Sequence, residues 1–160
     1  MNEVFRWVLI VYFATHVPIT LCVDLQGLIP KIYPDNLTNL LEWYTTAFED
    51  QLMAHPQPWF KSFLFAEGVF QLPFFFVALY GLLKKRNWLR IPSIIYGAHT
   101  STTVWPILAE TIAFKHSSYQ KTILLVLIYS PYFCMPLALA IYMAFVPTPF
   151  PHSPRRAKPL

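Results

Sequence analysis

Residues 63–76, FLFAEGVFQLPFFF, decide the fold of this chain. The stretch is apolar and aromatic except for one carboxylate, Glu67, one amide, Gln71, and one proline, Pro73. Glu67 and Gln71 are four residues apart, so on a helix their side chains share one face. A carboxylate inside a bilayer is costly, and a residue of that kind is by default a candidate functional site. What matters next is whether this stretch crosses a membrane, and what Glu67 faces there.

The overall composition is that of a membrane protein. Of the 160 residues, 56% are hydrophobic and 12% are charged, whereas roughly a quarter of the residues in soluble domains are charged. The length suits a single domain. The net charge of +4 is small and the basic residues fall in short clusters, which argues against a nucleic-acid-binding surface.

Four apolar segments predict an all-α fold with four transmembrane helices. They cover about residues 7–28, 62–83, 91–113 and 121–146, each long enough for a hydrocarbon core of about 30 Å. Each segment contains a proline, which removes a backbone hydrogen bond and bends its helix. We expect one transmembrane domain over residues 1–146 and a basic tail over residues 147–160.

A polar connection over residues 29–61 separates the first two segments. Within it, residues 39–48 carry Leu40, Trp43, Tyr44 and Phe48 at helical spacing. This pattern predicts a short amphipathic helix that lies against the membrane surface or caps the helix bundle.

The basic residues predict the orientation in the membrane. Four crossings leave both termini on one side, and the side richer in Lys and Arg is cytosolic. Eight of the 12 Lys and Arg residues fall on the side of the termini. The termini are therefore expected in the cytosol and the 29–61 connection in the lumen, where the short glycosylation sequon at Asn36 agrees weakly with this orientation.

Two carboxylates are expected at the same depth. From the helical rise, Asp24 lies roughly 6 Å and Glu67 roughly 7.5 Å inside the luminal ends of their segments. Neighbouring carboxyl groups in a low dielectric do not both ionise readily, so the pair would share a proton and favour a cationic or hydroxylated ligand. Two alternatives stay open. Asp24 lies in interfacial water, or Glu67 is a structural partner of Gln71 or of the Val69 carbonyl group that Pro73 leaves free.

The other polar residues predict neither a catalytic site nor a bound metal or cofactor. His16 and His99 are more typical of hydrogen bonds between helices than of catalysis, and Glu110 is more typical of an interfacial acid. Hydroxyl groups of residues 100–103 can bond back to their own helix. The sequence lacks paired cysteines and the H-x-x-x-H spacing of metal sites. Kinked, aromatic-lined helices with a few acids between them instead describe a site for lipophilic molecules.

Motifs along nearly the whole chain resemble the sigma-2 receptor family. The resemblance is carried by His16-Val17-Pro18-Ile19-Thr20, Asp24-Leu25-Gln26, the run from Trp59 through Glu67 to Phe75, Ile94-Ile95-Tyr96, His99-Thr100, Pro106-Ile107-Leu108 and Tyr129-Ser130-Pro131-Tyr132. This family belongs to the EXPERA superfamily, together with the emopamil-binding sterol isomerases. The chain is identified as a distant member, with a fungal source as one option.

The resemblance implies a four-helix protein of the endoplasmic reticulum, often dimeric, whose pocket opens to the bilayer and binds sterols or cationic amphiphiles. It implies that Asp24 pairs with the ligand amine, that Glu67 is its protonated hydrogen-bond partner, and that Asp50 shapes the pocket entrance. The other pocket positions that it implies are Gln71, Thr103, Tyr129, Tyr132, Trp43, Phe48, Met53, Phe63 and Leu64. Val23 and Gly68 depart from the family pattern beside the two acids, and Arg156 and Lys158 only partly match a retrieval signal for the endoplasmic reticulum.

Three functions are compatible with these features. We favour a non-catalytic protein that binds sterols or other lipophilic amines and hydroxyl compounds, and regulates sterol handling or protein trafficking. An interaction protein for clients, such as mitochondrial precursors at the endoplasmic reticulum surface, is the second. A sterol Δ8–Δ7 isomerase, with Asp24, Glu67 or His16 moving protons, ranks last because the resemblance is to the receptor branch. The expected partners are such a ligand, membrane lipids, a second copy of the chain and client proteins.

Overall fold

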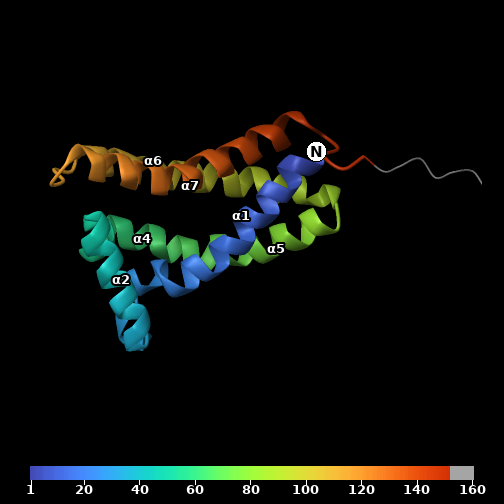
Figure 1. Ribbon diagram of the computed structural model, residues 1–160. Helices are drawn as coiled ribbons and strands as arrows, with labels where there is room; N and C mark the ends of the chain where they lie inside the picture. The colour runs from blue at the N-terminus through green and yellow to red at the C-terminus, as the bar shows by residue number, and fades with distance from the viewer. Residues whose placement is uncertain (152–160) are drawn as a thin grey trace, which may run out of the picture.

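The computed structural model describes residues 1–151, and these contain helices but no strand. One layer is formed by α1 (Glu3–Cys22) and by a continuous helix made of α4 (Pro58–Ala66), η3 (Glu67–Gln71) and α5 (Leu72–Leu83). The other layer is the hairpin of α6 (Arg90–Ala113) and α7 (Tyr119–Phe145), which lie side by side. Figure 1 shows the two layers meeting near the N terminus.

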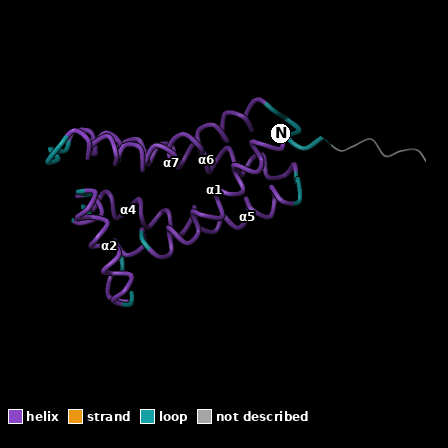
Figure 2. Tube along the Cα trace, in the orientation of Figure 1, coloured by secondary structure: helices purple, strands orange, loops and turns teal. Residues whose placement is uncertain are grey.

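Short helices connect the first layer. They are η1 (Asp24–Gly27), η2 (Pro30–Ile32), α2 (Asp35–Phe48) and α3 (Gln51–Ala54), and η4 (Asn87–Leu89) leads into α6. In Figure 1, α2 stands across the direction of the long helices at the end where α4 begins. Figure 2 shows that short loops join helices that make up most of the described chain. The helix predicted over residues 39–48 is thus the second part of a longer one.

Three helical segments are long and apolar enough to cross a membrane: Glu3–Gly27, Pro58–Leu83 and Tyr119–Phe145. They coincide with the first, second and fourth segments predicted from the sequence. The third predicted segment forms α6, a helix of 24 residues that lies beside α7. Its polar run from His99 to Thr103 lowers its hydropathy, so length and composition support three of the four predicted crossings.

Two hydrophobic clusters make up the core. One joins α1, α5, α6 and α7 through residues such as Phe13, Phe75 and Met143. The other lies under α2 and α3 and contains Leu64 and Ile107. Along the continuous helix 58–83, Glu67 lies between the residues of these clusters, so the polar groups fall where neither apolar cluster fills the space.

The helix over residues 58–83 is interrupted by one π turn. The Leu72 N–H group donates to the carbonyl oxygen of Glu67, five residues earlier, over the span Glu67–Gln71. Pro73, which follows directly, has no N–H group to continue a regular ladder. π turns of this kind frequently occur at functional sites. The turn from Glu67 to Gln71 contains one residue more than an α-helical turn. The two side chains are therefore not related by the regular α-helical geometry that the sequence predicted.

Hydrogen bonds close the end of the molecule near the N terminus. The Arg90 side chain donates to the carbonyl oxygens of Met143 (2.7 Å) and Ala144 (3.0 Å) at the end of α7. The Asn87 amide pairs with the backbone of Phe150 in both directions, at 2.9 Å each. These bonds tie the chain after α7 to the start of α6. Most of the predicted basic tail, including Arg156 and Lys158, lies outside the described residues.

Candidate functional site

A cavity of about 280 Å³, here called the main cavity, lies between the two helical layers. Its walls come from α1, η1, α2, α3, the helix 58–83, α6 and α7. Ten of the 12 side chains expected at a ligand site line it: Asp24, Glu67, Gln71, Thr103, Tyr129, Tyr132, Trp43, Met53, Phe63 and Leu64. Residues far apart in the chain therefore meet around one apolar space.

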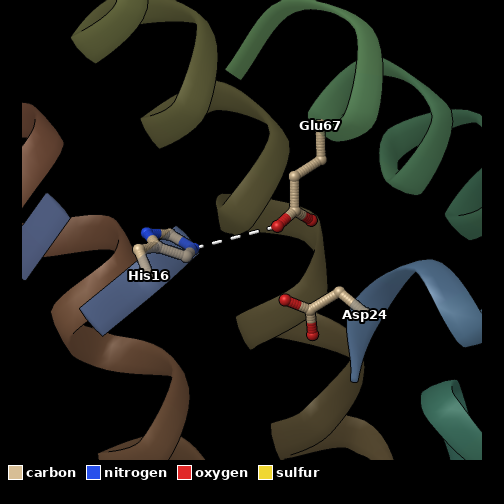
Figure 3. Close-up of side chains that lie close together, drawn as sticks. All are labelled: His16, Asp24 and Glu67. Atoms are coloured by element: carbon tan, nitrogen blue, oxygen red, sulfur yellow. Dashed lines mark ion pairs between the residues drawn. The ribbon is translucent and has the colours of Figure 1, made fainter. Parts of the chain in front are cut away.

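The two carboxylates face each other across the polar part of this cavity. One oxygen of Asp24, one oxygen of Glu67 and one ring nitrogen of His16 all lie within 4.8 Å of one another. Figure 3 shows the three side chains converging from separate parts of the ribbon. Helix α1 ends at Cys22, so Asp24 begins η1 rather than lying inside the first helix as the depth estimate assumed.

Glu67 has a different partner from those expected. The Thr20 hydroxyl group donates to Glu67 Oε1 at 2.5 Å, and Thr20 is fully buried in α1. This bond joins α1 to the π turn and fixes one oxygen of Glu67. The hydrogen bond carries the structural role that the sequence assigned to Gln71 or to the Val69 carbonyl group.

His16 is buried at the edge of this carboxylate pair. Its side chain is enclosed by rings, stacked on Phe75 with centroids 4.5 Å apart and tilted against Tyr132 at 4.6 Å. Nε2 lies 3.8 Å from Glu67 Oε1, which is too long for a hydrogen bond. Nδ1 is buried and has no partner among the described residues. Packing, rather than hydrogen bonding, therefore orients this imidazole.

Asp50 and Phe48, which were also expected at the site, do not line the main cavity. Asp50 is 2% exposed and begins α3, where its side chain accepts from the Met53 N–H group at 3.1 Å. It also accepts from the hydroxyl groups of Tyr44 (3.0 Å) and Tyr129 (2.6 Å), both of which do line the cavity. Asp50 thus fixes two residues of the cavity wall, Tyr44 and Tyr129, without lining the cavity itself.

The pKa of the Tyr44 hydroxyl group reflects its burial beside Asp50. Burial, with the neighbouring Asp50 carboxylate second, raises the pKa of Tyr44 well above its ordinary value. The phenol therefore stays protonated and remains a donor to Asp50. Phe48 packs against the rings of Trp43 and Tyr44, with centroids 6.0 and 5.1 Å away, so it supports side chains of the cavity wall.

The hydroxyl groups of residues 100–103 in α6 differ in whether they have a hydrogen-bond partner. Ser101, Thr102 and Thr103 bond back to carbonyl oxygens of their own helix, at 2.6, 2.8 and 3.0 Å, as the sequence predicted. Thr100 Oγ1 is buried without a partner among the described residues, and Thr100 lines the main cavity. Thr100 thus gives the cavity wall a hydroxyl group that has no hydrogen-bond partner among the described residues.

The ligand site expected from the sequence did not include His16, Thr20, Tyr44 or Thr100, and His16 was considered only as a hydrogen-bonding residue between helices or as a residue that moves protons in an isomerase. His16 is a polar residue in the middle of an apolar segment, and that signal alone marks it as a candidate. Thr20 gives no comparable signal, since a threonine in such a segment commonly bonds to its own helix. The metal-spacing rules could not group His16 with Asp24 and Glu67, because the three residues come from separate elements.

A smaller cavity of about 210 Å³ lies on the other side of Asp50. Glu110, His55 and His116 contribute to its lining. Glu110 is exposed there, which agrees with an interfacial acid, and it does not line the main cavity.

Comparison with known proteins supports the family that the sequence motifs resemble. A family model described as EXPERA (EXPanded EBP superfamily) matches residues 36–143. Sigma intracellular receptor 2 of Xenopus tropicalis is 45% identical over 152 residues, covering 89% of both chains. The Homo sapiens protein of that name is 45% identical over 152 residues, covering 86% of both chains.

A fungal protein is also similar. Efficient mitochondria targeting-associated protein 19 of Schizosaccharomyces pombe is 32% identical over 139 residues, which cover 82% of this chain and 70% of that protein. The chain is thus more similar to these vertebrate receptors than to the fission-yeast protein.

Proposed function

This chain belongs to the EXPERA superfamily and, within it, to the sigma-2 receptor family, and on that premise we propose that it binds sterols or cationic amphiphiles inside a membrane. The ligand occupies the main cavity. Binding regulates sterol handling or protein trafficking rather than chemical conversion of the ligand. The names of the vertebrate relatives, which are receptors, support a binding function.

The observation that carries this proposal is the pair of carboxylates in an aromatic-lined cavity. Asp24 and Glu67 approach within 4.8 Å, and Thr20 already satisfies one oxygen of Glu67. An ammonium group beside Asp24 offsets the cost of a buried negative charge. A sterol hydroxyl group can donate to one acid and accept from the other. The apolar remainder of the cavity receives the body of the ligand.

We propose four membrane crossings, with α6 as the third. Its 24 residues are long enough to span a bilayer, and its polar hydroxyl groups are largely satisfied within the helix. In this arrangement both termini are cytosolic, α2 and α3 are luminal, and the membrane is that of the endoplasmic reticulum. Attachment of a glycan at Asn36 in cells, and its loss in Asn36→Gln, would support the luminal assignment.

Lipid mass spectrometry of protein purified in mild detergent tests the sterol proposal. We expect sterol above background with the wild type and with Ile112→Trp, and little with Ile107→Trp. Ile107 lines the main cavity, whereas Ile112 is 62% exposed on the same helix, so the same substitution fills the cavity in only one case. Absence of sterol from the wild type, or equal recovery from both variants, would refute sterol binding in this cavity.

A second candidate function is the handling of client proteins. The printed name of the fission-yeast relative refers to mitochondrial targeting, which favours mitochondrial precursors as clients. Crosslinking and purification of wild type, Asp24→Asn and Glu67→Gln separates the two functions. Client capture that survives both substitutions while ligand binding is lost would assign clients to a surface outside the cavity.

Sterol Δ8–Δ7 isomerase activity is the enzymatic alternative, since the emopamil-binding sterol isomerases belong to the same superfamily as this chain. Complementation of an isomerase-deficient strain decides this point. We expect no growth, because the receptor relatives indicate binding without turnover. Growth supported by the wild type and lost in Glu67→Gln would replace the binding proposal with catalysis.

A further inference from the structure

Three potential metal ligands converge at the polar end of the main cavity. His16, Asp24 and Glu67 each offer one donor atom, and these atoms lie within 4.8 Å of one another. Among residues 1–151, no other three His, Cys, Asp or Glu side chains come together in this way. We propose that this cluster binds a divalent transition-metal ion, with Zn²⁺ as the ion that its donors fit best.

The donor set distinguishes between metals. One imidazole nitrogen and two carboxylate oxygens suit Zn²⁺, which binds such atoms at about 2.0–2.2 Å. Mg²⁺ and Ca²⁺ prefer sites made wholly of oxygen, with more ligands. Donors on one tetrahedral zinc ion lie about 3.4 Å apart. Side-chain rotations that bring the three atoms up to about 1.4 Å closer therefore complete the set.

The state of His16 is an independent reason to expect a ligand. Its side chain is 5% exposed, it faces the main cavity, and its ring nitrogens have no hydrogen-bond partner among the described residues. A buried polar side chain left without partners is costly. A metal ion at Nε2, the ring nitrogen that faces Glu67 at 3.8 Å, gives this nitrogen a partner, and Phe75 and Tyr132 already hold the ring in place.

The charge of a divalent ion also matches that of the two carboxylates. Two ionised carboxylates are expensive in an apolar cavity, and one divalent cation neutralises both. Zn²⁺ and the ammonium group of an amine ligand therefore compete for these two carboxylates. The Thr20 hydroxyl group, 2.5 Å from Glu67 Oε1, positions that carboxylate as partners behind a metal ligand commonly do. Three protein ligands leave a fourth position facing the cavity for water or for a polar group of another ligand.

Metal content measured without any amphiphile tests this inference separately from the proposed function. Untagged protein in mild detergent is equilibrated with Zn²⁺, and bound metal is then measured by mass spectrometry. We expect one Zn²⁺ per wild-type chain, loss in His16→Gln, and no change in His55→Gln. His55 is an exposed histidine outside the cluster, so this control removes adventitious binding at a surface imidazole.

Two further variants keep the test decisive if His16→Gln does not fold. Glu67→Gln removes a ligand while retaining an acceptor for Thr20, and we expect it to lose Zn²⁺. Thr20→Val removes only the positioning hydroxyl group, and we expect affinity to fall about tenfold. Retention of full Zn²⁺ binding in Glu67→Gln or His16→Gln would overturn the site, as would a wild type that binds no zinc.

X-ray absorption of the wild-type zinc complex needs no variant. We expect nitrogen and oxygen ligands only, including one imidazole. A sulfur ligand at about 2.3 Å would assign the ion to a cysteine and contradict the proposed site.

Discussion

At the scale of single residues, Glu67 is held by one hydrogen bond from Thr20. We predict that Glu67→Gln leaves the thermal stability of the protein nearly unchanged, because an amide oxygen accepts the same bond. Glu67→Ala leaves the buried Thr20 hydroxyl group unpaired, and we expect a loss of about 2 kcal/mol. Thermal unfolding in detergent measures both variants, with Glu110→Ala as the exposed control. Equal losses for Gln and Ala would contradict this role of Thr20.

Tyr129 provides a second prediction at this scale. Its hydroxyl group donates to the buried Asp50 carboxylate at 2.6 Å, and hydrogen bonds to charged groups contribute about 1.5–3 kcal/mol. We therefore expect Tyr129→Phe to destabilise the protein by about 2 kcal/mol. The control is Tyr119→Phe, since Tyr119 is 79% exposed at the start of the same helix. Indistinguishable unfolding temperatures of the two variants would show that the bond is unimportant.

The sequence identified ten of the 21 residues around the main cavity but few of their contacts. Asp24 and Glu67 stood out because carboxylates are rare in apolar segments, and the structure brings them together. Thr20, which bonds to Glu67, did not stand out, since a threonine is compatible with any helical environment. Asp50 was expected at the cavity entrance. Its partners Tyr44 and Tyr129 are separated from it by 6 and 79 residues, and the longer pairing depends on a tertiary contact that spacing does not reveal.

At the scale of elements, α2 is attached to the α6–α7 connection through Glu49. The Glu49 carboxylate accepts from the backbone N–H group of Ser117 at 2.8 Å and from the Ser117 hydroxyl group. These two bonds lower the pKa of Glu49 from its ordinary value of 4.5. A folded-state pKa below the unfolded value stabilises the fold above pH 4.5, and this contribution is lost as the pH falls through the folded value.

We predict that this attachment weakens in acid. The wild type should be more stable than Glu49→Gln above pH 4.5, and the difference should shrink as the pH falls below that value. Unfolding temperatures of both proteins across this range provide the measurement. Glu42→Gln is the control, because Glu42 is an exposed acid on the same helix. A stability difference between wild type and Glu49→Gln that grows as the pH falls would contradict this attachment.

The contact between α6 and α7 depends on Gly97. A methyl group at this position would lie 2.6 Å from Ala140 Cβ and closer still to the Pro136 carbonyl oxygen. We expect Gly97→Ala to destabilise the protein by about 1–3 kcal/mol through overpacking. Ala98→Val adds more volume at the neighbouring exposed position and should have little effect. A Gly97→Ala variant as stable as the wild type would show that the two helices separate easily.

The lengths of the apolar segments predicted the long helices well, because about 20 apolar residues between charged flanks mark where each helix begins and ends. The π turn could not be read from the sequence, although Pro73 marks its position. A proline is equally compatible with a kink, and only the Leu72 to Glu67 hydrogen bond distinguishes the two. Helix α6 was expected as a membrane span like the others, yet its hydroxyl-rich centre gives it a different composition from the three apolar spans.

At the scale of the whole molecule, two apolar clusters leave a cavity where polar residues of six elements meet. Composition predicted a membrane protein, and motifs predicted its family. The relative placement of the two layers could not be predicted, because it depends on tertiary contacts between them, such as the stacking of Phe74 on Tyr96 and the hydrogen bond from Tyr129 to Asp50. This placement determines which side chains face the main cavity.

The proposed function depends most on the binding of the ligand's cationic group by Asp24 in the main cavity. Equilibrium binding of a tertiary-amine amphiphile to wild type, Asp24→Asn and Glu110→Gln tests it most directly, with an uncharged analogue of the same shape as the ligand control. We predict that Asp24→Asn lowers affinity for the amine at least about thirtyfold, the equivalent of 2 kcal/mol. Affinity for the uncharged analogue should change much less, and Glu110→Gln should match the wild type. Equal amine affinity in Asp24→Asn and wild type would contradict the claim.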